Sequence, residues 1–165
     1  MIITSVIRSI NNIENENKSI DTLFLEWYET TKRIQRVTTE NGKNIALRFM
    51  GVTMRLKDGD VLFEDSDEII VVRIRPCRAI CVSPKDNTEM AKLCFELGNK
   101  HLPIFLQEGK VYMPYEQSTY NWLNKTDYQA TELAAVLSNQ ANPDMGLYYR
   151  QKNYSKKDLT IKIKL

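Results

Sequence analysis

The chain has 165 residues, 42% of them hydrophobic and 27% charged, which is the composition of an ordinary globular protein with room for one generous domain or two small ones. Its formal net charge is only +2, so nothing indicates a polyanionic partner held by bulk electrostatics. No apolar run approaches the roughly 20 residues of a membrane span, so no membrane partner is expected.

Residues 1–75 are predicted to form a small all-β domain. Two turn signals divide its β-rich segments: Asn41-Gly42, a hairpin signal because both residues tolerate positive φ, and Asp58-Gly59. A third turn is expected at 65–67, and no helical periodicity interrupts the segments. The expected strands are 23–27, 34–38, 44–49, 61–63 and 69–74.

The hydrophobic pattern changes at Pro76. After it, the clearest helix of the chain is expected at about 87–97. Asp86, with Glu89 three residues later, is the pattern of a helix N-cap with an acidic partner. Gly98 is expected to supply the left-handed residue that ends the helix. The buried face is predicted from apolar residues at the i, i+3, i+4, i+7 spacing, which are Met90, Leu93, Cys94 and Leu97.

Short strands and a second helix complete the domain predicted for residues 76–138. The strands are expected at 78–82, 104–106, 111–113 and 128–133, and the second helix contains Tyr120, Trp122 and Leu123. The order strand, helix, strand, strand, helix, strand is that of a ferredoxin-like βαββαβ domain, so the whole chain is predicted to be α+β. Residues 139–165 form a basic tail, with six Lys and Arg against two Asp and no histidine.

The residues do not support catalysis, so we expect the protein not to be an enzyme. His101 is the only histidine, and beside Lys100 it could in principle serve a cysteine or serine nucleophile. The cysteines, however, lie in segments where cysteine acts as a small hydrophobe, and no nucleophile elbow, phosphate-binding glycine loop or dinucleotide fingerprint is present. Three cysteines in a chain without a recognisable export signal indicate reduced thiols, so the expected compartment is the cytoplasm.

Two other groups of potential metal ligands have simpler explanations. Cys77 and Cys81 have a spacing that invites zinc, but structural zinc needs four ligands and the second pair is missing. Buried structural cysteine is therefore the preferred interpretation. The carboxylates at 58–60 and 65–68 resemble fragments of a calcium loop, but the glycine and the terminal Glu are not at the required offsets. They are interpreted as turn residues.

A ferredoxin-like topology also occurs in RNA-recognition modules, which use exposed sheet aromatics and a basic face. Phe105 and Tyr112 could be such aromatics, but residues 76–138 are near neutral and carry no matching basic, aromatic-rich motif. We therefore expect no nucleic-acid partner.

His101 lies where the helix is expected to give way to a strand. By itself it has a simple explanation, because a cation at a helix C-terminus complements the helix dipole. Its surroundings favour a metal ligand instead. The segment 90–104 resembles the signature segment of the urease accessory protein UreE family, in which Ala-x-x-Cys-Tyr-Glu-(Leu/Ile)-Gly-Asn-Arg-His precedes a strand. Segments 25–33, 56–62 and 72–80 resemble that family's N-terminal strands and inter-domain junction, so the resemblance covers about residues 1–135.

This resemblance implies a nickel metallochaperone that delivers Ni(II) to a urease apoprotein complex with a GTPase partner. It implies a peptide-binding-like N-terminal domain, and a C-terminal domain that binds metal and forms a homodimer with His101 at the interface. Because a two-fold axis presents one residue twice, two His101 imidazoles would supply two nitrogen ligands, a type that suits nickel, copper and zinc. Water, a carboxylate or a partner's side chain must complete the coordination shell.

The sequence departs from the family in three ways. No histidine follows His101, so a metal reservoir in the tail is not expected, and Tyr115 and Gln117 stand where some relatives carry further histidines. Lys100 replaces the usual arginine, which keeps the charge but loses the bidentate fork. About one metal per dimer is therefore expected. The alternative hypothesis is a protein-interaction scaffold of the urease assembly complex, in which metal binding is secondary.

Overall fold

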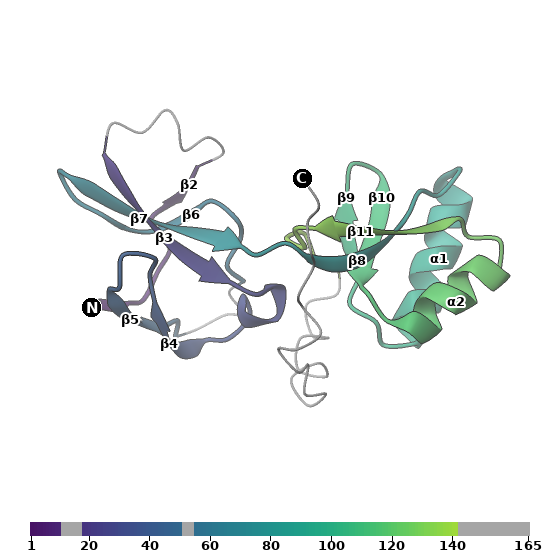
Figure 1. Cartoon of the computed structure of the whole chain (residues 1–165), viewed down its shortest axis with the longest axis horizontal. Helices are drawn as coiled ribbons and strands as arrows, with labels where there is room; N and C mark the ends of the chain where they lie inside the picture. Colours follow the sequence, from purple (N-terminus) through teal and green to yellow (C-terminus); the bar gives the residue numbers. More distant parts are fainter. Residues whose placement is uncertain (11–17, 51–54, 142–165) are drawn as a thin grey trace. The chain divides into compact units, whose positions relative to one another are not determined.

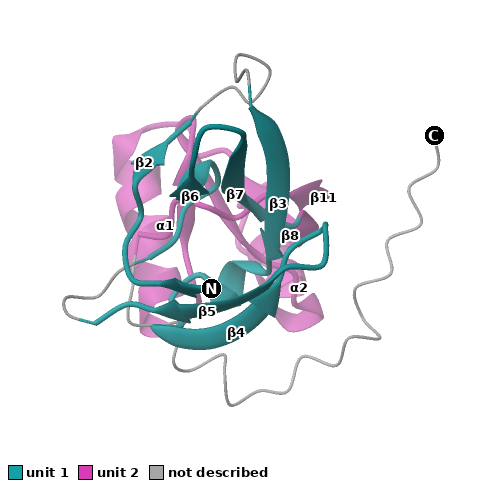
Figure 2. Ribbon diagram, turned by 90° about the vertical axis from the view of Figure 1, so that its left-hand side faces the viewer, with its two compact units in different colours: residues 1–75 teal, residues 76–165 magenta. Residues whose placement is uncertain are grey.

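The computed structural model describes residues 1–10, 18–50 and 55–141. The chain divides into two compact units, Met1–Arg75 and Pro76–Leu165 (Figure 2). Within these described ranges, unit 1 is built from strands and a short 3₁₀ turn, and unit 2 from a sheet with two helices. The predicted α+β fold class is therefore confirmed. No helix within the described ranges is long and apolar enough to cross a membrane.

The described strands of unit 1 form two sheets (Figure 1). The first has three strands in the order β1-β5-β4, and the second has four strands in the order β2-β6-β7-β3. The strands are β1 (Ile2–Ile3), β2 (Arg8–Ser9), β3 (Ser19–Leu25), β4 (Ile34–Thr38), β5 (Asn44–Arg48), β6 (Asp60–Glu64) and β7 (Glu68–Ile74).

The core of unit 1 is organised around β7, which pairs antiparallel with β6 and parallel with β3. Ile70 and Val72 belong to the main core, together with Leu47 from the other sheet. Ile69 and Val71 pack on the opposite face in a smaller cluster. Because both faces of β7 are covered, its sequence is apolar without alternation.

The predicted hairpin at Asn41-Gly42 is confirmed, since β4 and β5 pair antiparallel from Ile34 with Arg48 to Thr38 with Asn44. Only Gly42 has positive φ, however, at 84°. The Gly42 N–H donates to the Thr39 carbonyl at 3.0 Å and the Thr39 N–H to the Lys43 carbonyl at 3.0 Å. This is a three-residue loop that ends in a left-handed glycine rather than a two-residue turn.

Other strands of unit 1 differ from the prediction. β3 starts at Ser19 and stops at Leu25, and Trp27 belongs to a 3₁₀ turn, η2 (Trp27–Glu29). There the Glu26 N–H donates to the Glu29 carboxylate at 3.1 Å, a local bond that favours the turn over continued strand. β1 and β2 were not predicted, because two-residue strands are too short to show an alternating pattern.

Unit 2 has the predicted ferredoxin-like architecture. Its elements are β8 (Cys77–Val82), α1 (Asn87–Asn99), β9 (Phe105–Gln107), β10 (Lys110–Pro114), α2 (Gln117–Lys125) and β11 (Ala130–Ala135). The sheet order is β11-β8-β10-β9 and every neighbouring pair is antiparallel. Both helices lie on one side of this sheet (Figure 1).

Local signals explain how these elements begin and connect. The Asp86 carboxylate caps α1 by accepting from the Glu89 N–H at 2.8 Å, as predicted. Glu108 and Gly109 join β9 to β10, and both have positive φ, 48° and 72°, which is the geometry of a tight two-residue hairpin turn.

After β11 the chain returns to the outer edge of β9. The Leu106 N–H donates to the Asn139 carbonyl at 2.9 Å, and the Ala141 N–H to the Ile104 carbonyl at 2.7 Å. Leu137, within this return, is only 1% exposed and extends the core. The predicted tail, 139–165, lies outside the described residues from 142 onwards.

Gly59 is expected to be essential to unit 1. Its φ is 88°, and a Cβ there would lie 2.2 Å from the Ile10 carbonyl oxygen. Gly59→Ala combines this clash with the left-handed cost of about 1–2 kcal/mol, so it should lower the free energy of unfolding in urea by more than about 2 kcal/mol. Gly42→Ala is the matched control: its φ is 84° but no atom lies within 4 Å, so only the backbone cost applies. Equal losses in the two variants would contradict the assignment of the clash.

Glu64 should make the stability of unit 1 depend on acid pH. Arg8 and Lys18 each lie 2.9 Å from its carboxylate and lower its pKa to about 2. A lowered pKa stabilises the fold above the unfolded-state pKa of about 4.3, and this contribution disappears as pH falls toward the folded value. Glu64→Gln should therefore be less stable than wild type at pH 7, with the difference shrinking between about pH 4 and pH 2. Urea unfolding checks this, and a difference independent of pH would contradict it; the exposed Glu40→Gln serves as control.

Candidate metal site at the end of helix α1

His101 lies in the turn that closes α1, and the structure corrects the predicted geometry of that turn. The helix continues to Asn99, and Gly98 is an ordinary helical residue without positive φ. The left-handed residue is His101 itself, with φ at 56°. The expectation that Gly98 would be the left-handed residue was wrong. The hydrogen bonds that close the helix place the left-handed conformation three residues later, at His101.

Two backbone hydrogen bonds define this closure. The Leu102 N–H donates to the Leu97 carbonyl at 3.1 Å, and the His101 N–H donates to the Gly98 carbonyl at 2.9 Å. Together they form a Schellman motif, in which the residue after the C-cap, here His101, adopts the left-handed conformation. Leu97 and Leu102 are both buried, so the turn is held to the core on either side of the exposed His101.

A histidine in this position carries a conformational cost. Glycine usually occupies it, since a left-handed residue with a Cβ costs roughly 1–2 kcal/mol. Histidine is one of the side chains found there more often than average, yet the backbone does not require it. Backbone strain of this kind is concentrated at functional sites, which makes His101 a candidate on structural grounds.

The alternative explanation of His101, as a cation on the helix dipole, is weakened by its neighbour. Lys100 already places a permanent positive charge at this end of α1, and its ammonium lies 4.5 Å from the centre of the Trp122 ring on α2. A lysine or arginine in the last helical turn would serve the dipole without the cost of a left-handed backbone.

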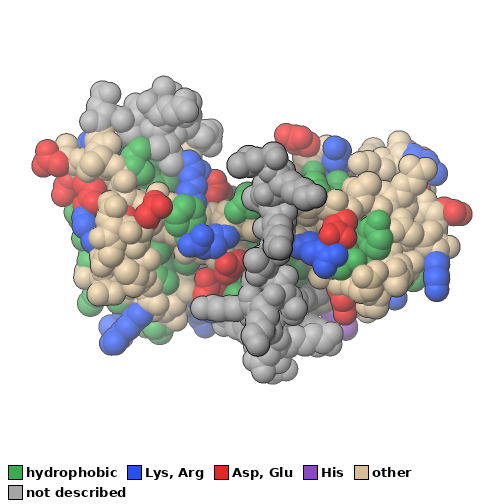
Figure 3. Space-filling model, in the orientation of Figure 1, with side chains coloured by type: hydrophobic (Ala, Val, Ile, Leu, Met, Phe, Trp, Pro, Cys, Tyr) green, Lys and Arg blue, Asp and Glu red, His purple; other side chains and the backbone are tan. Residues whose placement is uncertain are grey.

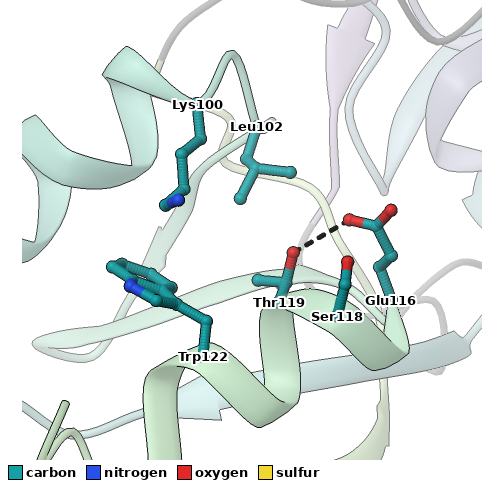
Figure 4. A pocket seen from close by; sticks show the side chains of 6 residues that line it. All are labelled: Lys100, Leu102, Glu116, Ser118, Thr119 and Trp122. Atoms are coloured by element: carbon teal, nitrogen blue, oxygen red, sulfur yellow. Dashed lines mark hydrogen bonds between the residues drawn. The ribbon is translucent and has the colours of Figure 1, made fainter. Parts of the chain in front are cut away.

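A shallow pocket adjoins the turn (Figure 4). Lys100 and Leu102, the residues on either side of His101, form one wall, and α2 forms the other. At the start of α2, the Thr119 hydroxyl donates to the Glu116 carboxylate at 2.9 Å. The pocket has a volume of about 280 Å³ and is lined by Lys100, Leu102, Glu116, Ser118, Thr119 and Trp122.

The described part of one chain does not assemble a complete metal site. No group of three or more His, Cys, Asp or Glu side chains comes together within residues 1–10, 18–50 and 55–141.

The cysteines have the predicted structural character. Cys77 and Cys81 are buried on β8, at 3% and 6% exposure. Cys94 on α1 is half-buried, its Sγ lies 3.8 Å from the Met90 sulfur, and burial raises the pKa of its thiol. A raised pKa disfavours the thiolate that binds metal.

The carboxylates interpreted as turn residues are engaged by neighbouring backbone or side-chain groups. Asp65 accepts from the Asp67 and Glu68 N–H groups, at 2.9 and 2.8 Å. Asp58 accepts from the Ile74 N–H at 2.7 Å and binds Arg73. Asp60 accepts from the Lys57 N–H at 2.8 Å. These hydrogen bonds and the ion pair account for the positions of the three carboxylates as turn residues, so no bound cation is needed to explain them.

Tyr115 and Gln117, which stand where some relatives carry histidines, contact each other. The Tyr115 hydroxyl donates to the Gln117 side-chain oxygen at 2.9 Å. The Arg78 guanidinium lies 3.6 Å from the Tyr115 ring centre and forms a two-pronged pair with Glu132. The segment is thus organised by aromatic and ionic contacts.

Comparison with known proteins follows the division into two units. Residues 3–75 match the family described as UreE urease accessory protein, N-terminal domain, and residues 71–158 match its C-terminal domain. Urease accessory protein UreE of Flavobacterium johnsoniae is 42% identical over 142 residues, which cover 86% of each chain. That of Haemophilus influenzae strain PittGG is 34% identical over 83% of this chain and 76% of its own. That of Helicobacter pylori strain G27 is 31% identical over 93% and 92%.

The two matched domains define a urease accessory protein, a class of chaperone rather than an enzyme. Within that class, the chain belongs to the UreE family. The resemblance found in the sequence is therefore confirmed, and so is the expectation that the protein is not an enzyme.

His101→Gly should stabilise the metal-free protein, because glycine adopts the left-handed conformation without strain. We expect a gain of about 1 kcal/mol in the free energy of unfolding, measured in urea. His101→Ala is the control, since it removes the imidazole but keeps a Cβ at the strained position. If glycine and alanine gave the same stability, the backbone cost assigned to His101 would be refuted.

Proposed function

We propose that this protein is a nickel-binding metallochaperone, which delivers Ni(II) to apo-urease during assembly of the urease active site. The metal binds at the interface of a homodimer through His101 of each subunit. The observation that supports this assignment best is the exposed imidazole held in a left-handed turn, where the fold alone would favour glycine. Membership of the urease accessory family supports the nickel cargo.

The chemistry of the donor set suits a carrier. Two imidazole nitrogens are good ligands for Ni(II), and also for Cu(II) and Zn(II). They leave several coordination positions to water, a carboxylate or a partner's side chain, so the shell stays open and the ion can be passed on. Copper binds such ligands more tightly than nickel, so selectivity has to come from metal supply or from the recipient.

The two units have separate roles in this proposal. Residues 1–75 form a peptide-binding-like domain that contacts the urease apoprotein complex or its accessory GTPase. Residues 76–138 bind metal and dimerise, and residues 139–165 form a basic tail without histidines. The protein acts in the cytoplasm, as its free cysteines suggest.

A second function, a scaffold of the urease assembly complex, is favoured by apolar side chains exposed on unit 1. Ile2, Ile34 and Met50 are 67%, 69% and 75% exposed. Large apolar side chains at a surface can serve as contacts for another protein. In this alternative, metal binding through His101 is secondary.

Calorimetric titration of the metal-free protein with Ni(II) tests the carrier proposal. Wild type should bind about half an equivalent per chain with high affinity, because two subunits share one ion. His101→Asn should abolish this binding while keeping the turn, since asparagine tolerates the left-handed conformation and has no imidazole. High-affinity binding retained by the variant, whether at half an equivalent or at a full equivalent per chain, would refute the site.

Urease maturation in cells separates the carrier from the scaffold. Cells that carry His101→Asn should produce urease of low nickel content and low activity if the protein is a carrier. Normal maturation with that variant would favour the scaffold instead.

A further inference from the structure

The three-stranded sheet of unit 1 covers the core with one face and exposes the other. Ile3, Ile45 and Leu47 belong to the core, so the alternate residues of the same strands point outward. Among these, Ile2 is 67% and Ile34 69% exposed, although both are large aliphatic side chains. We call this surface the outer face, which includes Ile2 of β1, Ala46 and Arg48 of β5, and Ile34, Arg36 and Thr38 of β4.

The outer face is basic as well as apolar. Arg36 and Arg48 are exposed, and neither forms an ion pair within the described residues. The register places Arg48 opposite Ile34, and Arg36 opposite Ala46, which in turn pairs with Ile2. In Figure 3, hydrophobic (green) and basic (blue) side chains gather at the lower left of unit 1, where Figure 1 places β4 and β5. Such a surface is complementary to a partner that carries aliphatic and acidic groups.

β4 also presents a row of backbone groups at the margin of this sheet. The strand order is β1-β5-β4, so β4 has a neighbouring strand on one side only. At the end of the ladder, the Thr39 N–H donates to the Lys43 carbonyl at 3.0 Å. Because hydrogen-bonded pairs alternate along an antiparallel ladder, the N–H and C=O groups of Ile34, Arg36 and Thr38 are directed to the open edge. Within the described residues, no other strand pairs with them there.

We propose that the open edge of β4 and the outer face bind an extended acidic segment of a partner protein, which adds to the sheet as a further strand. The inference rests on the proposed function, in which unit 1 contacts the urease assembly complex. In an antiparallel pair, residues directly opposite each other lie on the same face. The segment therefore carries an aliphatic side chain beside Ile34 and, two residues away, an acidic side chain beside Arg36. Backbone bonds supply affinity and the alternate side chains supply specificity.

A protein segment accounts for this surface better than an anionic lipid surface does. Exposed isoleucines and arginines suit both partners, since lipid headgroups can also be negatively charged. Only a peptide, however, satisfies the row of backbone donors and acceptors along β4. A charged residue on an edge strand can serve simply to prevent unwanted pairing. That explanation covers Arg36 but not the exposed Ile34 beside it, which favours pairing.

Fluorescence anisotropy of labelled peptides with the full chain tests the proposal. The probe repeats the sequence Ile-Thr-Glu-Thr, and lysine replaces glutamate in a matched control peptide. The acidic probe should bind at least about tenfold more tightly, because like charges meet in the control complex. N-methylation of its isoleucine and glutamate residues removes the N–H groups directed at β4 and should abolish binding. N-methylation of the threonines, whose N–H groups point away from β4, should leave the affinity nearly unchanged.

Variants of the protein test whether the peptide binds at the outer face. Arg36→Gln combined with Arg48→Gln should weaken binding of the acidic probe about fivefold. Ile34→Ser should weaken it at least about fivefold, as for an apolar contact at the centre of an interface. All three side chains are exposed, so circular dichroism should remain that of wild type. Lys57→Gln and Ile7→Ser change exposed side chains of unit 1 outside this face and should leave the affinity unchanged.

Several results would overturn the proposal. No binding of the acidic probe, or equal binding of the acidic and lysine peptides, would remove the acidic partner. Binding that survives N-methylation at isoleucine and glutamate would remove the added strand, and unchanged affinity in the Arg36, Arg48 and Ile34 variants would remove the outer face. Wild type that binds vesicles containing phosphatidylglycerol but not the acidic probe would show a lipid surface instead, which also overturns the proposal.

Nickel titration of the same samples separates this inference from the proposed function. If wild type binds half an equivalent of nickel and no peptide, the carrier stands and the docking surface is wrong. If wild type binds the acidic probe but no nickel through His101, the docking surface stands and the metal site is wrong. The Ile34→Ser variant should bind nickel as wild type does, because its substitution lies in the other unit.

Discussion

The candidate site depends on how the carbonyl groups at the end of α1 are satisfied. The last turn of any helix leaves carbonyls without intrahelical partners, and here the Leu97 and Gly98 carbonyls are taken by the N–H groups of Leu102 and His101. That closure requires a left-handed residue between a helix and a buried leucine. It therefore exposes one side chain at a fixed point, with Leu97 and Leu102 holding the turn to the core.

Function and stability are opposed in this turn. The fold would be served best by glycine at position 101, and the helix by alanine at position 98, but the chain has histidine and glycine there. Both choices cost stability in the isolated subunit. In the proposed metal carrier, the histidine at position 101 has a use as a ligand.

The sequence predicts most of the fold because the relevant signals are local. The β4–β5 hairpin follows from Asn41-Gly42, the start of α1 from Asp86, and the ferredoxin-like order from the sequence of element types. The end of α1 was mispredicted because glycine ends many helices, whereas this helix ends where Leu102 can be buried. The strands β1 and β2 were missed because two-residue strands depend on pairing with β5 and β6, far along the chain.

The sequence predicts which residue is the candidate ligand, but it does not predict the geometry around that residue. The residues around His101 identify the family, and the family points to the imidazole, but neither contains the backbone angle that makes His101 unusual. The interaction of Lys100 with Trp122 was equally hidden, because it joins two helices that are distant in sequence. The local sequence motif therefore identifies the candidate ligand, whereas the position and backbone conformation of that ligand depend on tertiary contacts.

The contact between Lys100 and Trp122 also gives the molecule an optical reporter. The chain has two tryptophans; Trp27 is buried in unit 1, and Trp122 is half-buried beside the residue that precedes His101. Indole emission responds to the charge and polarity around the ring. Movement of the turn therefore changes the fluorescence of Trp122 and leaves that of Trp27 as an internal reference, so events at the turn can be followed in the unlabelled protein.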